Sequence, residues 1–125
     1  MPELKKYKMF INGEWVNSDT KKTFETLNPE NNKPWAVVPE ASASDVDRAV
    51  KAAQNAFEGE WPKLLPKERA RYLRMIGDKL RDNAEHLGKI ETIDTGKLYR
   101  ETYKQANYIA EYYDYYAGLA DKVEG

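Results

Sequence analysis

The segment Tyr99–Lys122 constrains the fold of this chain more than any other. Seven of the nine tyrosines fall between Tyr99 and Tyr116. At helical spacing two neighbouring stripes form, one of Tyr108, Tyr112 and Tyr115 and one of Ile109, Tyr113 and Tyr116. Together with Leu119 they cover more than half of the circumference, which predicts a helix buried on most sides. A chain of 125 residues offers little to cover such a helix, so we expect it to be part of something larger.

The seven residues before this helix predict its junction with the preceding one. Gly96 is expected at the left-handed position that follows a helix C-terminus, and Lys97 near the negative end of the dipole. In the preceding helix, Leu87, Ile90 and Ile93 recur at helical spacing and are expected to face inward.

Two further amphipathic helices are predicted upstream. In the first, Ser44 is the expected N-cap, and the apolar stripe consists of Val46, Ala49, Val50, Ala53 and Phe57. In the second, Pro66 suits the first helical position, and the expected buried face is Ala70, Leu73, Ile76, Gly77 and Leu80. The predicted helices cover residues 44–58, 66–83, 84–95 and 98–120.

The first forty residues favour short antiparallel strands. Apolar runs flank Asn12-Gly13, the pair most typical of a tight hairpin. Thr23–Leu27 and Trp35–Val38 predict two more strands around a turn at residues 28–32. The expected fold is therefore α+β and mainly helical, an N-terminal hairpin and strands followed by amphipathic helices. We expect one unit over residues 1–125, β-rich in 1–40 and helical in 44–122.

Composition narrows the possible functions. The chain has 20 basic and 21 acidic residues, no cysteine and one histidine. The charge balance argues against general nucleic-acid binding, and the absence of cysteine excludes a thiolate nucleophile within these residues. No apolar run approaches the roughly 20 residues of a membrane span. The first residues lack the apolar core of a signal peptide, so a cytoplasmic protein without nucleic-acid or membrane partners is expected.

Six stretches, taken in order, resemble the N-terminal part of the aldehyde dehydrogenase superfamily. They are residues 10–16 (FINGEWV), 26–29 (TLNP), 44–53 (SDVDRAVKAA), 68–73 (ERARYL), 91–97 (ETIDTGK) and 115–122 (YYAGLADK). No single stretch is diagnostic, but their order and spacing carry the resemblance across nearly the whole chain.

The resemblance implies an NAD(P)-dependent enzyme that oxidises an aldehyde to a carboxylic acid, of which this chain would be about the first quarter. In that family a thiohemiacetal forms on a cysteine, hydride passes to the nicotinamide, and a glutamate activates water. This chain has no cysteine and no glycine-rich nucleotide loop. We therefore expect no catalytic and no cofactor-binding residues here. NAD or NADP is expected in the complete enzyme, none bound by this chain alone, and no activity from it alone.

The resemblance also points to four site residues. Thr26 and Asp94 match positions that help to hold a monovalent cation in the family, where hard oxygen ligands suit the ion. The plainer interpretation is strand pairing for Thr26 and helix-end hydrogen bonding for Asp94. Tyr108 and Tyr112 fall where the family's equivalent helix lines the aldehyde tunnel, and the plainer interpretation is aromatic packing.

His86 and the basic face of residues 67–81 are both expected to be ordinary solvent-exposed surface. His86 follows Glu85 on a polar helix face, which favours a solvated role. The basic face of residues 67–81 is interrupted by Glu68 and Asp78 and lacks a stacking platform, which favours a solvated helix surface.

Two classes of function remain open. In the first class, the chain is the N-terminal segment of an aldehyde dehydrogenase, and the remainder of that enzyme is its partner. Alternatively, it is a non-enzymatic helical domain that binds a protein partner or self-associates, most simply as a dimer that buries Tyr108, Tyr112 and Tyr116. An open reading frame with a cysteine nucleophile after Gly125 would favour the first class, and a stop codon would favour the second.

Overall fold

A computed structural model describes residues 4–122. All of its strands precede its helices along the chain. Five short strands come first and four helices follow. The strands are β1 (Lys5–Lys6), β2 (Met9–Ile11), β3 (Glu14–Val16), β4 (Thr23–Asn28) and β5 (Lys33–Pro39). The helices are α1 (Ala43–Glu58), α2 (Pro66–Asp82), α3 (Ala84–Thr95) and α4 (Tyr99–Leu119), with a single 3₁₀ turn at Trp61–Lys63. The predicted fold class and all four helices are confirmed.

The chain divides into two compact units, Met1–Pro62 and Lys63–Gly125. Helix α1 belongs with the strands, and α2, α3 and α4 form the second unit. The structure does not test whether residues 1–125 fold as one domain, so that expectation stays a prediction.

The β2–β3 hairpin turns where the sequence predicts. Met9 pairs with Val16 and Ile11 with Glu14. The turn residues Asn12 and Gly13 take φ values of 53° and 81°, the left-handed region that asparagine and glycine tolerate best.

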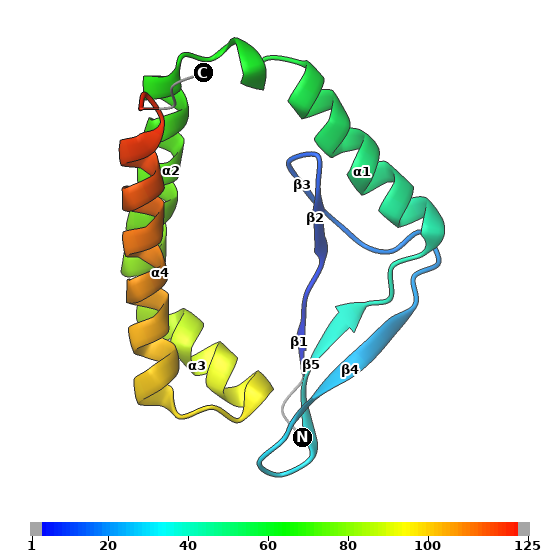
Figure 1. Cartoon of the computed structure of the whole chain (residues 1–125). Helices are drawn as coiled ribbons and strands as arrows, with labels where there is room; N and C mark the ends of the chain where they lie inside the picture. The colour runs from blue at the N-terminus through cyan, green and yellow to red at the C-terminus, as the bar shows by residue number, and fades with distance from the viewer. Residues whose placement is uncertain (1–3, 123–125) are drawn as a thin grey trace. The chain divides into compact units, whose positions relative to one another are not determined.

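A three-stranded sheet has the order β1-β5-β4 (Figure 1). β4 and β5 are antiparallel as predicted, but β1 runs parallel to β5, so the expectation of antiparallel strands alone is wrong at this edge. Tyr7 N–H donates to Val37 O at 2.9 Å and extends the pairing. The two lysines of β1 carry no alternating apolar pattern, so the sequence offers no signal for this strand.

Ser42, not Ser44, caps α1. Asp45 N–H donates to Ser42 Oγ at 3.1 Å, and Ser42 N–H donates to the Asp45 carboxylate at 2.9 Å. This reciprocal pair is a capping box with aspartate in the place of glutamate. Ser44 is exposed inside the helix, so the predicted cap lies two residues too far along.

Asp45 also ties the loop before β4 to α1. Ser18 Oγ donates to its carboxylate at 2.8 Å, Arg48 pairs with it, and the residue is 1 % exposed. These contacts hold the pKa of the Asp45 carboxyl well below its usual range, the Ser42 backbone N–H contributing most, and they outweigh the opposing effect of burial. The stability that this carboxylate contributes is therefore complete above the ordinary aspartate pKa of about 4 and is lost only in stronger acid.

The apolar stripe of α1 is present but uncovered. Val46, Val50 and Phe57 are each more than half exposed. Since a large side chain left in water forgoes about 1.5–3 kcal/mol of burial energy, this stripe is a surface that residues 4–62, the described part of the first unit, leave open.

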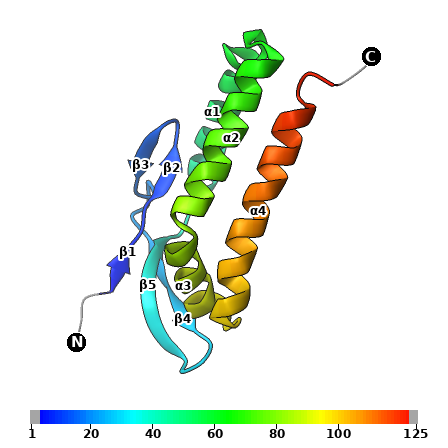
Figure 2. The same cartoon turned by 90° about the vertical axis from the view of Figure 1, so that its left-hand side faces the viewer.

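Small residues form the packing surfaces of the second unit, in which α4 lies beside α2 and α3 (Figure 2). The buried positions are Ala70 and Gly77 of α2, Ala84 and Gly88 of α3, and Thr102, Ala106, Ala110 and Ala117 of α4. A Cβ on Gly88 would lie 3.0 Å from Tyr103 Cα, so the two backbones approach very closely.

This close approach overturns part of the predicted core. Ile76, Leu87 and Ile93 were expected to face inward, yet each is more than a third exposed. Large side chains cannot occupy a seam this narrow, so small residues line it. In α2 these are Ala70 and Gly77, both part of the predicted face. In α3 they are Ala84 and Gly88, which the prediction did not include. Within residues 4–122, the tyrosine-rich helix is buried along one face only. Its burial on most sides was expected as part of something larger and stays a prediction.

The α3–α4 junction follows the prediction at Gly96 and adds a buried hydroxyl. Gly96 takes a φ of 76° and its N–H donates to Thr92 O at 2.9 Å. Thr102, fully buried, donates to Gly88 O at 2.9 Å and lies 3.0 Å from the Thr92 hydroxyl. Lys97 Nζ reaches Glu91 at 2.8 Å.

Candidate functional site

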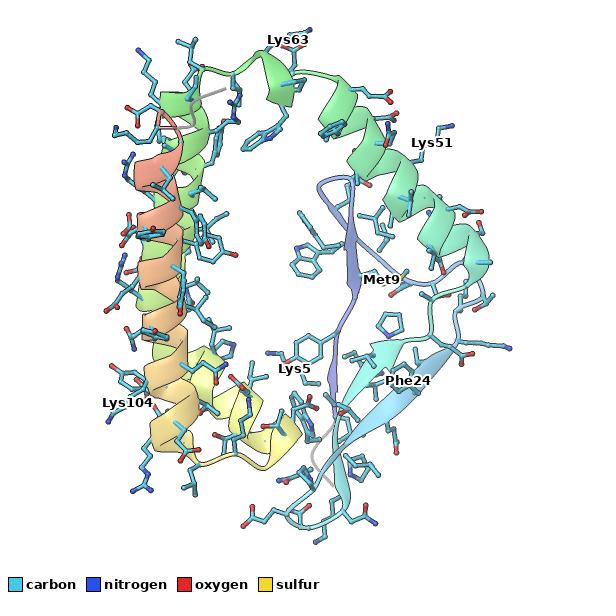
Figure 3. The ribbon with its side chains drawn as sticks, viewed as in Figure 1. Lys5, Met9, Phe24, Lys51, Lys63 and Lys104 are labelled. Carbon is cyan, nitrogen blue, oxygen red and sulfur yellow. The ribbon has the colours of Figure 1, made fainter. Side chains whose placement is uncertain are left out.

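The strongest candidate site is a shallow hollow on the outer face of α4. Tyr108, Glu111, Tyr112, Tyr115 and Tyr116 line it, and it encloses about 360 Å³. All five residues belong to one helix at spacings of one to four residues, so the regular geometry of α4 alone brings them together. Lys104, labelled in Figure 3, lies one turn before Tyr108 and does not line the hollow.

Tyr108 and Tyr112, the two tunnel residues predicted by resemblance, form one pair. Their hydroxyl oxygens are 3.1 Å apart, their ring centroids are 5.0 Å apart, and the rings meet edge to face at 82°. The hydrogen bond with Tyr108 raises the pKa of Tyr112, so the Tyr112 hydroxyl stays protonated near neutral pH. The two side chains are 56 % and 49 % exposed, which leaves their outer ring faces open.

Three further residues complete the hollow. Tyr115 and Tyr116 also pack edge to face, with centroids 5.3 Å apart at 88°. Sequence reasoning placed Tyr115 on the Tyr108 stripe but put Tyr116 on the next one, and it missed Glu111. Helical spacing could have predicted Glu111, because it lies three residues after Tyr108 and four before Tyr115 and therefore shares their helix face.

The two predicted cation ligands lie in different units. Thr26 pairs with Ala36 in the sheet, at the point where the β4–β5 register shifts. Asp94 lies in the last turn of α3. A shared cation site at Thr26 and Asp94 therefore stays a prediction.

A second, more apolar groove lies on α2 and α3. Tyr72, Met75, Ile76, Leu80 and Leu87 supply its walls, with polar contributions from Lys79, Asn83 and His86, and it encloses about 500 Å³. The exposed side chain of His86 agrees with the solvated role expected for it. On the basic face of α2, Arg81 pairs with Asp114 and Asp78, which holds this cation in a local ion-pair network.

Comparison with known proteins identifies the chain at the level of a family. The profile of the aldehyde dehydrogenase family matches residues 15–125. This chain belongs to the aldehyde dehydrogenase family.

Relatives with known names are similar across nearly the whole chain. A (Z)-2-((N-methylformamido)methylene)-5-hydroxybutyrolactone dehydrogenase from Acinetobacter baylyi is 42 % identical over 123 residues, which are 98 % of this chain and 25 % of that protein. Aldehyde dehydrogenase family 2 member C4 from Arabidopsis thaliana is 39 % identical over all of this chain and 25 % of its own length. The chain thus spans about a quarter of these aldehyde dehydrogenases.

Solved structures of the family agree. The NAD⁺ complex of an aldehyde dehydrogenase from Bacillus cereus matches with a TM-score of 0.92 and 41 % identity, over 97 % of this chain and 25 % of that one. An NAD-dependent aldehyde dehydrogenase from Sinorhizobium meliloti matches with a TM-score of 0.93 and 31 % identity, over 98 % of this chain and 25 % of that one.

Within residues 4–122, none of the helices of this aldehyde dehydrogenase segment is long and apolar enough to cross a membrane. The same part of the chain contains no group of three or more histidine or acidic side chains placed to hold a metal ion.

Proposed function

We propose that the chain is the N-terminal portion of an NAD(P)-dependent aldehyde dehydrogenase that oxidises an aldehyde to a carboxylic acid. The observation that carries this proposal is the family match over residues 15–125 together with the coverage of only a quarter of each relative. Two of the similar structures are described as NAD-dependent or as an NAD⁺ complex, which supports a nicotinamide cofactor in the complete enzyme. We also propose a cytoplasmic location, as expected from the sequence.

We further propose that residues 1–125 alone neither oxidise an aldehyde nor bind the dinucleotide specifically. The chemistry implied by the resemblance needs a cysteine thiolate, and this segment has no cysteine. The remainder of the enzyme is then the obligatory partner of this segment.

In the complete enzyme, Tyr108 and Tyr112 contribute to the path of the aldehyde. Their open ring faces supply apolar contact, and their hydroxyl pair supplies both a donor and an acceptor. Such a surface orients a substrate with a polar substituent better than one with an alkyl chain, because the hydroxyls need partners of their own once the site closes.

The test compares the 125-residue chain with the product of the complete gene. Formation of NADH or NADPH is followed at 340 nm with a panel of short polar and alkyl aldehydes. We expect aldehyde-dependent reduction with the complete product and none with the chain alone. Reduction by the purified chain, or an inactive complete product that binds no dinucleotide, would contradict the proposal.

A second role is favoured by the exposure of the tyrosine face. Tyr108, Tyr112 and Tyr116 are about half exposed on one helix, and contiguous exposed aromatic surface commonly marks an interface. We propose that the isolated chain self-associates through these residues, most simply as a symmetric dimer.

A further inference from the structure

We propose that Asn12 is a site of spontaneous modification, at which the side-chain amide reacts with the Gly13 backbone nitrogen while the β2–β3 hairpin is open. One product of this reaction prevents the hairpin from closing again. Asn12 and Gly13 form the tip of the hairpin, and both residues are exposed. The inference goes beyond the proposed function and does not rest on it, because it uses residues of the first unit alone.

The chemistry needs only water. After the Gly13 N–H has lost its proton to solvent, the nitrogen attacks Cγ of Asn12, and an imide ring forms. The bond from Cγ to Nδ2 breaks, and Nδ2 takes up a proton and leaves as ammonia. Water then opens the ring at either of its two carbonyls, which gives aspartate by one route and isoaspartate by the other. One water is consumed, one ammonia is released, and no atom changes its oxidation state.

The closed turn keeps the reacting atoms apart. The φ values of 53° at Asn12 and 81° at Gly13, with two residues between the paired Ile11 and Glu14, define a type I′ turn. Its first central residue has a ψ of about +30°, which turns the Gly13 nitrogen away from the Asn12 Cβ about the Cα–C bond. Ring closure requires the nitrogen and Cβ on the same side of that bond. The closed hairpin is therefore protected from the reaction.

The hairpin should open more readily than the three-stranded sheet. Within residues 4–122, β2 and β3 have three residues each and pair with each other, outside that sheet. A two-stranded hairpin is only marginally stable by itself in water. One of its faces carries the cross-strand pair Phe10 and Trp15, whose rings lie 5.0 Å apart and whose side chains are 61 % and 67 % exposed. Local opening can therefore free Asn12 while the three-stranded sheet stays folded.

Isoaspartate at this position would keep the hairpin open. In isoaspartate the main chain runs through Cβ and Cγ, which adds one carbon atom to a turn whose geometry depends on two residues of fixed φ and ψ. The pairing of Ile11 with Glu14 at the base of the turn could then not form. The aspartate product has a normal main chain, and aspartate before glycine suits the same turn, so it leaves the hairpin intact.

The first test compares the folded and the unfolded chain. The 125-residue chain is kept at neutral pH with and without guanidinium chloride, and conversion of Asn12 is followed by peptide mass spectrometry with separation of the two products. We expect conversion in the folded chain at a rate about tenfold or more below that in the unfolded chain. Equal rates, or no conversion in the folded chain by the time the unfolded chain has fully reacted, would overturn the proposal.

Two variants test whether hairpin opening sets the rate. Trp15→Thr removes the aromatic pair and keeps a residue suited to a strand, so conversion of Asn12 in the folded chain should be about two- to tenfold faster. Gly88→Val is the control, because it disturbs the second unit, and it should leave the rate unchanged. Both variants should react at the ordinary rate when unfolded. An unchanged rate in Trp15→Thr, or equal acceleration in the two variants, would contradict gating by the hairpin.

The loss of pairing is tested on the purified isoaspartyl chain. It is compared by NMR with Asn12→Asp, which carries the other product with its normal main chain. We expect cross-strand contacts between Phe10 and Trp15 in Asn12→Asp and their loss in the isoaspartyl chain, with the pairing of β4 and β5 unchanged in both. Cross-strand contacts that persist in the isoaspartyl chain would show that the product does not keep the hairpin open.

Discussion

The two faces of α4 use the same helix in opposite ways. The inner face presents Thr102, Ala106, Ala110 and Ala117, all buried against α2 and α3. The outer face presents Tyr108, Tyr112, Tyr115 and Tyr116, all about half exposed. The large aromatic side chains, which could bury the most area, lie where residues 63–122, the described part of the second unit, leave them half exposed.

On α4, therefore, the small side chains make the packing contacts and the large side chains lie on the opposite, exposed face. Helices approach closely when small residues meet, and a close approach leaves no room for a large ring in the seam. The aromatic surface is therefore free to serve a ligand or partner. If this account is right, substitutions on the inner face change stability and substitutions on the outer face change binding.

The largest effect is expected at Gly88. A Cβ there would meet Tyr103 Cα and N at 3.0 Å, so Gly88→Val forces the α3 and α4 backbones apart. We expect a loss of about 1–3 kcal/mol in the free energy of unfolding, measured with urea. Gly118→Val is the matched control, because a Cβ at Gly118 would meet no atom within 4 Å. Equal losses in the two variants would show that the seam is not close-packed.

Thr102 should come next. Its buried hydroxyl bonds to Gly88 O and lies beside the Thr92 hydroxyl. Thr102→Val keeps the shape and removes these bonds, so we expect a loss of about 1–2 kcal/mol in urea unfolding. Thr102→Ser, which keeps the hydroxyl and its bond to Gly88 O, should lose less stability in urea unfolding than Thr102→Val. An unchanged stability in Thr102→Val would mean that water supplies the missing bonds.

A smaller loss of stability is expected at the Ser42 N-cap of α1, in the first unit. Ser42→Ala removes the acceptor for Asp45 N–H, and we expect it to cost about 0.5–2 kcal/mol. Ser44→Ala tests the same chemical change at an exposed position inside α1 and should be neutral or slightly stabilising. If thermal unfolding showed a larger loss of stability for Ser44→Ala than for Ser42→Ala, Ser44 would be the cap.

Sequence patterns were sufficient for the elements of the fold but not for its contacts. Helical periodicity and the Asn12-Gly13 pair predicted α1 to α4 and the hairpin to within one or two residues. The inward faces of α2 and α3 were partly wrong. In α2 the predicted face correctly included Gly77 but also Ile76, which is exposed. In α3 the predicted face named Leu87, whereas the buried neighbour is Gly88, because hydrophobicity favours the large side chain. Only the distance between the two helix backbones decides whether a large or a small side chain fits in the seam. The cap was wrong because Ser42 and Ser44 satisfy the same rule, and Asp45 selects Ser42 through its three-residue spacing.

The candidate site was predictable in part. Resemblance singled out Tyr108 and Tyr112, and the structure places them in hydroxyl contact. Glu111 was missed because a lone acidic residue on an exposed helix face is ordinary. The structure shows that it lines the same hollow as four tyrosines. Thr26 and Asp94 remain predictions, because they lie in different units.

The smallest effect on stability is expected from the outer face. Replacing Tyr108 and Tyr112 with serine removes two half-exposed rings, so we expect the unfolding free energy of the monomer to change by no more than about 0.5 kcal/mol per site. Urea unfolding at low protein concentration measures this. A loss as large as that of Gly88→Val would show that these rings belong to the core.

Sedimentation equilibrium of the 125-residue chain at about tens of micromolar tests the central claim most directly, because an aromatic face that the fold leaves uncovered should find a partner. The account predicts a reversible dimer whose dissociation constant rises when Tyr108 and Tyr112 are both replaced by serine. A well-folded chain that stays strictly monomeric, with a sedimentation profile unchanged by those substitutions, would contradict it.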